Sequence, residues 1–159
     1  MDVHLTFDIE VWCGGGWKNL DEKFPAAFRR YVYGPLPKET GALPLNLQIL
    51  REHGLEAIFF VEPLFSLRFG LAPLQEIVHL LHENGQEVQL HLHPEWADEL
   101  AVPLVPKRKK TAHLHAFGLD DQRTLIAAAA SRLEEAGAER PSAFRAGNFS
   151  MNGDTLTAL

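Results

Sequence analysis

The sequence predicts an α/β fold built on a parallel sheet, and within that class a partial (β/α) barrel. Strand-like apolar segments alternate with segments of helical periodicity, which is typical of parallel sheets covered by helices. The segment 56–62 is almost continuously apolar, as expected for a parallel strand with both faces covered. Candidate chemical residues follow three of the strands, where (β/α) barrels place their sites. No glycine-rich phosphate loop follows a strand, so a dinucleotide-binding open sheet has no support.

The first part of the chain is expected to hold two strands and one helix. Apolar and polar residues alternate over 3–8, which predicts a strand. Residues 14–42 begin with three glycines and are rich in Gly, Pro and aromatic residues, so we expect a long ordered loop. That loop either forms a wall of a substrate cleft or packs over the barrel end. Leucines within 43–50 share one helical face, Gly54 is a suitable helix stop, and 56–62 form the second strand.

The second part is expected to continue the alternation. Pro73 suits the first turn of a helix that ends at Gly85, and a strand follows over 86–92. Residues 94–119 are expected to form another long loop. Asp120 or Asp121 is expected to cap a third helix that ends at Gly137. Its buried face is expected to contain Leu125, Ile126, Ala129 and Leu133.

A fourth strand is expected over 142–145, and 154–159 have the character of the opening of another helix. Four strands do not close a (β/α) barrel. We therefore expect residues 1–159 to be the N-terminal portion of a single barrel domain, cut after roughly half of it. A half-barrel of this kind exposes an edge strand.

Composition excludes several classes of protein. The formal net charge of −6 argues against a nucleic-acid-binding surface, which needs an excess of Lys and Arg. The one basic run, 107–110, is expected to be a solvated loop, with attraction of an anionic substrate as the alternative. The single cysteine, Cys13, excludes an intramolecular disulfide. The sequence contains neither a signal-peptide pattern nor an apolar run long enough for a membrane span, so we expect a cytoplasmic protein.

Two pairs of residues carry the chemistry. Asp8 and Glu10 end the first strand, and His91 and His93 end the third. Side chains at i and i+2 of a strand point to the same face, so each pair projects together. Carboxylate and imidazole ligands suit zinc and other divalent transition metals, which can turn water into a nucleophile. The pairs therefore predict a divalent metal site that is able to activate water.

Each candidate also has a structural interpretation. Acidic residues after a strand can be solvated ends, and buried histidines are often hydrogen-bonded core residues. Glu95 is a reserve ligand, while His113 and His115 repeat the His-x-His spacing in a loop, where no strand aims them. Arg145, at the end of the fourth strand, can pair with a carboxylate of the site or form a surface salt bridge.

Together these segments resemble the polysaccharide deacetylase family, the NodB-homology domain. LTFDIEVW is similar to the family's first motif in an Asp-x-Glu variant, EVQLHLHPEW to the second, and AFRAGNFS to the third. The resemblance implies a distorted (β/α) barrel of seven repeats and a divalent metal, commonly zinc. It also implies a carbohydrate substrate, with hydrolysis of an N-acetyl group on an amino sugar or of a related amide or ester.

The resemblance also implies roles for individual residues. Asp8 would be the general base, with Arg145 holding it ionised and oriented. Glu10 would replace the family's metal-binding aspartate, and His91 would be the first ligand histidine. The second ligand histidine usually stands four residues after the first, where this chain has Glu95, so either His93 or Glu95 supplies that ligand. We prefer His93 because it shares a strand face with His91.

The resemblance leaves three functions open. The family's general-acid histidine belongs to the C-terminal half, so the 159 residues alone are expected to be inactive. The first alternative to a deacetylase is an inactive, carbohydrate-binding homologue, because fold does not fix function. The second is a metal hydrolase of a non-sugar amide. The sequence does not predict the oligomeric state.

Overall fold

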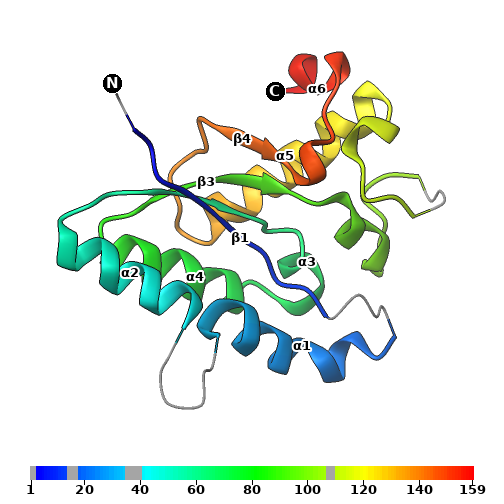
Figure 1. Ribbon diagram of the computed structural model, residues 1–159. Coiled ribbons are helices and arrows are strands. Elements are labelled where there is room, and N and C mark those ends of the chain that lie inside the picture. Colours follow the sequence, from blue (N-terminus) through cyan, green and yellow to red (C-terminus); the bar gives the residue numbers. More distant parts are fainter. Residues whose placement is uncertain (1–2, 14–17, 35–40, 107–109) are drawn as a thin grey trace.

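Four parallel strands form the sheet in the computed structural model, which describes residues 3–13, 18–34, 41–106 and 110–159 (Figure 1). The strands are β1 (Thr6–Ile9), β2 (Ile58–Val61), β3 (Glu87–Leu92) and β4 (Phe144–Ala146). Within this part of the chain they stand in the order β1-β2-β3-β4, each hydrogen-bonded to the next along the chain. The predicted α/β class with a parallel sheet and four strands of a barrel is confirmed.

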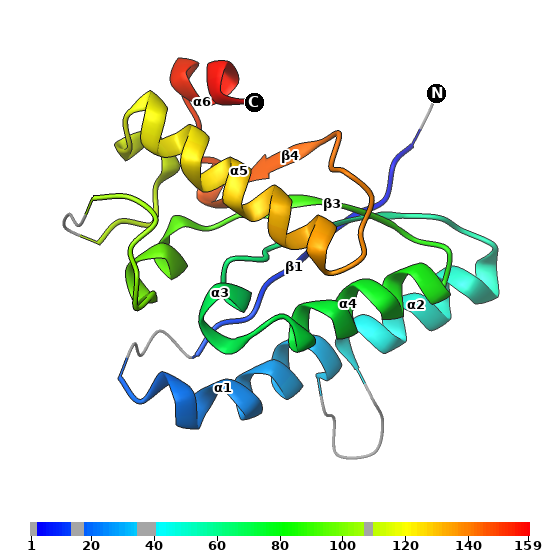
Figure 2. The ribbon, with the colours of Figure 1, turned by 180° about the vertical axis from the view of Figure 1, so that it is seen from behind.

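Helices connect the strands and cover one face of the sheet. In both views α2 and α4 run side by side, and α5 lies behind β3 and β4 in Figure 1 and in front of them in Figure 2. The α-helices are α1 (Leu20–Phe28), α2 (Ala42–His53), α3 (Ser66–Phe69), α4 (Ala72–Glu83), α5 (Leu119–Glu135) and α6 (Gly153–Ala158). A π-helix, η1 (Arg29–Tyr33), continues α1, and the short 3₁₀ helices are η2 (Pro94–Glu99), η3 (Leu114–Ala116) and η4 (Gly147–Phe149). Among the described helices, none combines the length and apolar character needed to cross a bilayer.

Strand alternation gives the sheet two chemically different faces. The face toward the helices is apolar and belongs to the buried core, with Ile9, Phe59, Val61, Val88, Leu90 and Leu92. The opposite face carries polar side chains that the register places in rows. Asp8 aligns with Phe60 and Gln89, and His91 aligns with Arg145. All strands are parallel, so the carboxyl ends of β1 and β3 meet at the same edge of the sheet.

The predicted helix faces are confirmed. Leu43, Leu47 and Leu50 of α2 are buried, and Gly54 ends the helix with φ of 61°. Fully burying one such leucine contributes about 1.5–3 kcal/mol to stability. In α4 and α5 the buried side chains include those expected from the sequence: Leu74, Ile77, Val78, Leu81, Leu125, Ile126, Ala129 and Leu133.

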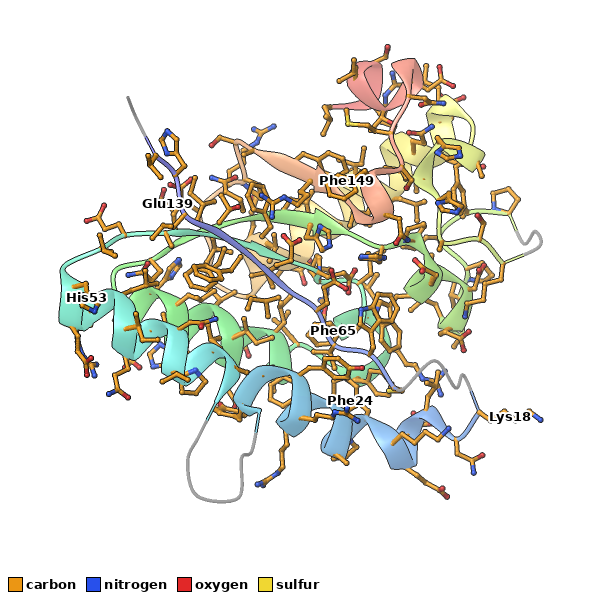
Figure 3. All side chains as sticks on the ribbon, viewed as in Figure 1. Lys18, Phe24, His53, Phe65, Glu139 and Phe149 are labelled. Carbon is orange, nitrogen blue, oxygen red and sulfur yellow. The ribbon has the colours of Figure 1, made fainter. Side chains whose placement is uncertain are left out.

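The prediction of an ordered loop over 14–42 is wrong for its middle part. Residues 20–33 form α1 and η1, and Leu20, Phe24 and Phe28 lie at helical spacing on the buried face. Pro25 inside the helix and the glycine run before it favoured the loop interpretation. Burial of the aromatic residues outweighs the hydrogen bond lost at Pro25. Figure 3 shows Phe24 and Phe65 beneath β1, and their ring centroids are 5.7 Å apart.

Other boundaries differ from the sequence predictions. Asp120 and Asp121 do not cap α5; Gly118 is its N-cap, and both aspartates lie in the first turn. Carboxylates there still interact favourably with the positive end of the helix dipole. Val3 lies outside β1, and the loop over 94–119 contains η2 and η3. The glycine run at 14–16 and residues 107–109 of the basic run lie outside the described residues.

Candidate metal centre

Glu10, His91 and His93 converge at the carboxyl edge of the sheet. Each offers a ligand atom, and these atoms all lie within 4.8 Å of one another. Glu10 Oε1 is 2.8 Å from His91 Nε2 and 3.4 Å from His93 Nε2. The histidine side chains are 3% and 8% exposed and that of Glu10 is 25% exposed, so one side of the cluster stays open to solvent.

The other polar atom of each of these side chains is held by a neighbour. His91 Nδ1 lies 2.9 Å from the carbonyl oxygen of Arg145, and His93 Nδ1 lies 3.4 Å from Glu95 Oε2. Trp12 Nε1 donates a hydrogen bond to Glu10 Oε2. Partners of this kind on the far nitrogen fix the tautomer and ring direction of metal-binding histidines. Both Nε2 atoms and Glu10 Oε1 therefore face the same point.

The donor set and spacing fit a divalent transition metal. Zinc binds imidazole nitrogen and carboxylate oxygen at about 2.0–2.2 Å, so two ligand atoms of a tetrahedral site lie roughly 3.4 Å apart. The distance from Glu10 Oε1 to His93 Nε2 has this value. The distance from Glu10 Oε1 to His91 Nε2 is 2.8 Å, which is the length of a direct hydrogen bond, and it would lengthen if both atoms bound one metal ion. Three protein ligands with one open side are typical of catalytic zinc sites.

Glu95 lies on the outer side of His93. Its carboxylate contacts Nδ1, whereas Glu10 contacts Nε2, so the ring separates the two carboxylates. Of the two residues between which the sequence left the third ligand open, His93 belongs to the convergent cluster and Glu95 does not. Glu95 is placed to orient His93.

Asp8 and Arg145 form an ion pair on the same face of the sheet, next to the cluster. Arg145 donates from Nη1 to Asp8 Oδ1 and from Nη2 to Thr6 Oγ1, the latter over 2.9 Å. Its guanidinium lies 4.0 Å from the centroid of the Phe60 ring, in cation–π geometry. The arginine thus reaches from β4 across β2 to β1, which shows how far the sheet curls. Asp8 is 36% exposed and open to an incoming molecule.

A buried carboxyl group next to β2 was missed by the sequence reasoning. Glu62 follows β2 directly and is fully buried. It accepts hydrogen bonds from the backbone N–H groups of Leu64 and Phe65. Burial raises the pKa of Glu62 to about 8, although these hydrogen bonds and the charge of His93 oppose the rise. A charged residue closing an apolar strand, as in the segment Ile-Phe-Phe-Val-Glu, was the signal that could have found it.

Charge in the cluster is strongly coupled. Burial raises the pKa of Glu10, but hydrogen bonds from His91, His93 and Trp12 outweigh it and hold the pKa well below its usual range. Burial lowers the pKa of His93, but the neighbouring carboxylates of Glu10 and Glu95 outweigh it and raise the pKa to about 10. Without a metal, a proton on His93 therefore supplies the positive charge between these carboxylates. A divalent ion would replace that proton.

An open cavity of about 500 Å³ lies beside the cluster. Its lining includes Glu10 and His93 together with Lys110, the one described residue of the basic run 107–110. Lys110 forms an ion pair with Glu99. The remaining lining residues are Trp12, Glu95, Thr111, Ala112 and Asn148.

The other candidates lie outside the cluster. His113 and His115 are exposed and stack on each other with ring centroids 5.3 Å apart. Burial raises the pKa of the Cys13 thiol, which disfavours the reactive thiolate and so does not favour a thiol nucleophile at this position.

Comparison with known proteins identifies the fold. No protein-family model matches the chain, and no curated protein matches it. Several solved structures do, among them the following three. A family 4 carbohydrate esterase from Streptomyces lividans, in complex with acetate, matches with a TM-score of 0.57 and 18% identity, over 98% of this chain and 56% of that chain. The peptidoglycan deacetylase PdaC from Bacillus subtilis matches with a TM-score of 0.53 and 18% identity, over 97% of this chain and 52% of that chain. A protein from Mycobacterium smegmatis described as a polysaccharide deacetylase matches with a TM-score of 0.61 and 22% identity, over 98% of this chain and 46% of that chain.

The chain therefore has the polysaccharide deacetylase-type fold, as its sequence motifs predicted. It spans about half the length of each of these structures. Its four strands correspond to a half-barrel of that fold. At this level of identity the likeness shows the fold alone.

Proposed function

We propose that the protein is a metal-dependent hydrolase that removes N-acetyl groups from amino sugars of a polysaccharide, or cleaves a related amide. The observation that carries this proposal is the convergence of Glu10, His91 and His93 at the open end of a deacetylase-type half-barrel. The cavity beside the cluster leaves room for a sugar unit. The proposed substrate is a carbohydrate.

In this proposal Glu10 Oε1 and the Nε2 atoms of His91 and His93 hold a divalent metal, with zinc as the ion that best suits the donor set. When bound, such an ion lowers the pKa of a water molecule and polarises a carbonyl group. Trp12 and Glu95 keep the donor atoms of Glu10 and His93 aimed inward.

Asp8 is the proposed general base. It shares the sheet face of Glu10 and lies two residues earlier, roughly 7 Å along the strand, so a water molecule between them is within reach of both. As the water attacks the acetyl carbonyl, Asp8 Oδ2 takes its proton, because Oδ1 is occupied by Arg145. The C–N bond then breaks, acetate is released, and the leaving amine nitrogen receives a proton. Arg145 fixes the direction of the carboxylate through two hydrogen bonds to β1.

The test is acetate release from N-acetylglucosamine oligosaccharides by the complete protein. Chelation should abolish release, and zinc should restore it. Asp8→Asn should lower kcat by a factor on the order of 10²–10⁴ while zinc affinity stays within about threefold of the unchanged protein. Equal loss of zinc and activity in Asp8→Asn would move Asp8 into the ligand set and contradict its role as base.

The same assay separates the alternatives. Binding of the oligosaccharide without acetate release would support an inactive, carbohydrate-binding homologue. Hydrolysis of small cyclic amides without acetate release would support a metal hydrolase of a non-sugar amide.

A further inference from the structure

Gly147, the first residue after β4, lies against the imidazole of His93. A Cβ atom added at Gly147 would come within 2.5 Å of Cε1 and 2.6 Å of Nδ1 and Nε2 of that ring. Non-bonded heavy atoms normally stay about 3.5–4.0 Å apart. No side chain fits between the backbone at Gly147 and the ring, so only glycine is compatible with this position of His93.

The backbone does not explain this glycine. Gly147 does not adopt a positive φ, so other amino acids can take its backbone conformation. Asn148 and Phe149, which follow it, do adopt positive φ without being glycine. Glycine is therefore required at position 147 because the His93 ring occupies the space that a side chain would need.

The backbone around Gly147 has little freedom to retreat from an added side chain. Its carbonyl oxygen accepts hydrogen bonds from Ser150 N over 3.1 Å and from Ser150 Oγ over 2.8 Å. Ser150 is buried, and its Oγ also accepts a hydrogen bond from Leu114 N over 2.9 Å. A clash at Gly147 is therefore relieved on the side of His93.

The ring of His93 also lacks an alternative position. Trp12 packs edge-on against it, with ring centroids 4.9 Å apart and planes at 86°. Trp12 itself stacks on the fully buried Trp96. Glu10 and Glu95 hold the two ring nitrogens from opposite sides. If the ring of His93 is pushed away from Gly147, its Nε2 atom no longer points toward Glu10 Oε1.

We propose that Gly147 is a positioning residue of the metal centre, whose missing side chain leaves the space in which His93 presents Nε2 beside Glu10. The inference rests on the proposed metal centre and adds a residue of β4 to it.

The test compares zinc affinities, measured by competition with a chromophoric chelator. Gly147→Ala is expected to weaken zinc binding several-hundredfold, as much as His93→Ala does. Gly118→Ala is the matched control, because Gly118 is exposed, has φ of −70° and has no atom within 4 Å of an added Cβ. The control should stay within twofold of the unchanged chain.

A double-mutant cycle separates a specific clash from general damage. In the His93→Ala background the space is free, so adding Gly147→Ala should change zinc affinity less than twofold and leave the Tm unchanged. In the unchanged background Gly147→Ala should lower the Tm. Additive losses, unchanged zinc affinity of Gly147→Ala, or unfolding in both backgrounds would overturn the inference. If the unchanged chain binds no zinc, the metal centre fails, while the Tm comparison still decides whether Gly147 makes space for His93.

Discussion

Replacement of the two residues that compete for the third ligand position distinguishes their roles. His93→Gln removes a proposed ligand atom, Nε2, which lies 3.4 Å from Glu10 Oε1. Glu95→Gln changes only the group that faces Nδ1 on the other side of the ring. We expect His93→Gln to weaken zinc binding far more than Glu95→Gln.

The magnitudes follow from the site. Sites with four protein ligands bind zinc with about 10–16 kcal/mol, so one ligand accounts for roughly 2.5–4 kcal/mol, a factor on the order of 10² to 10³ in affinity. Loss of an outer partner of a ligand histidine typically costs about 10–100-fold. A glutamine at 95 keeps a polar oxygen beside Nδ1, where the Glu95 carboxylate now lies at 3.4 Å, so Glu95→Gln should lie near the tenfold end.

The assay is a zinc titration of each variant against a chromophoric chelator at pH 7.5. His113→Gln serves as the control, because His113 belongs to the exposed His-x-His pair and should change zinc affinity less than twofold. The reasoning is refuted if Glu95→Gln loses several-hundredfold in affinity and His93→Gln loses tenfold or less. Such a result would show that Glu95 binds the metal and that His93 only orients Glu95.

Three further predictions concern residues around the cluster. Arg145→Lys should slow acetate release by the complete protein about tenfold, because lysine cannot bond Asp8 and Thr6 together; zinc affinity should change less than threefold, since the backbone carbonyl that orients His91 remains. Metal-free protein should lose stability as the pH rises from about 6.5 towards 10, by up to about 1.4 kcal/mol per pH unit, because the raised pKa of His93 favours the protonated folded state. Denaturant unfolding of His93→Gln should lack that decline between pH 8 and 10, above the titration of Glu62, and an equal slope in both proteins over that interval would contradict the assignment. Burial raises the pKa of Glu62 to about 8, so the stabilising contribution of its protonated form is fully present below about pH 4.5 and is lost as the pH rises through 8. Glu62→Gln should flatten the dependence of the unfolding free energy on pH between these values. An unchanged slope would show that Glu62 does not titrate there.

Periodicity predicted those parts of the fold that repeat a regular pattern. The buried faces of α2, α4 and α5 follow from leucines and other apolar residues at helical spacing, and β2 follows from its apolar run. Helix α1 was missed because Pro25 and the preceding glycines are local signals for a loop. The burial of Phe24 and Phe28 that overrides them depends on tertiary contacts.

The chemistry of the site could be predicted from strand spacing only in part. Spacing predicted that Asp8 and Glu10 share one face and that His91 and His93 share one face, and the structure brings Glu10 and both histidines together. Which ring nitrogen faces inward depends on partners that lie far away in sequence. The carbonyl of Arg145, for example, lies 54 residues from His91. The contact of Gly147 with His93 likewise exists only because β3 and β4 are neighbours.

The central claim is that Glu10, His91 and His93 hold one divalent metal ion. X-ray absorption at the zinc edge of the zinc-loaded chain, combined with metal quantification, measures this most directly. The account predicts one zinc ion per chain, coordinated only by nitrogen and oxygen, with two imidazole ligands that fall to one in His91→Ala. Substoichiometric zinc in the unchanged chain, or a bound ion with no imidazole in its coordination shell, would contradict it.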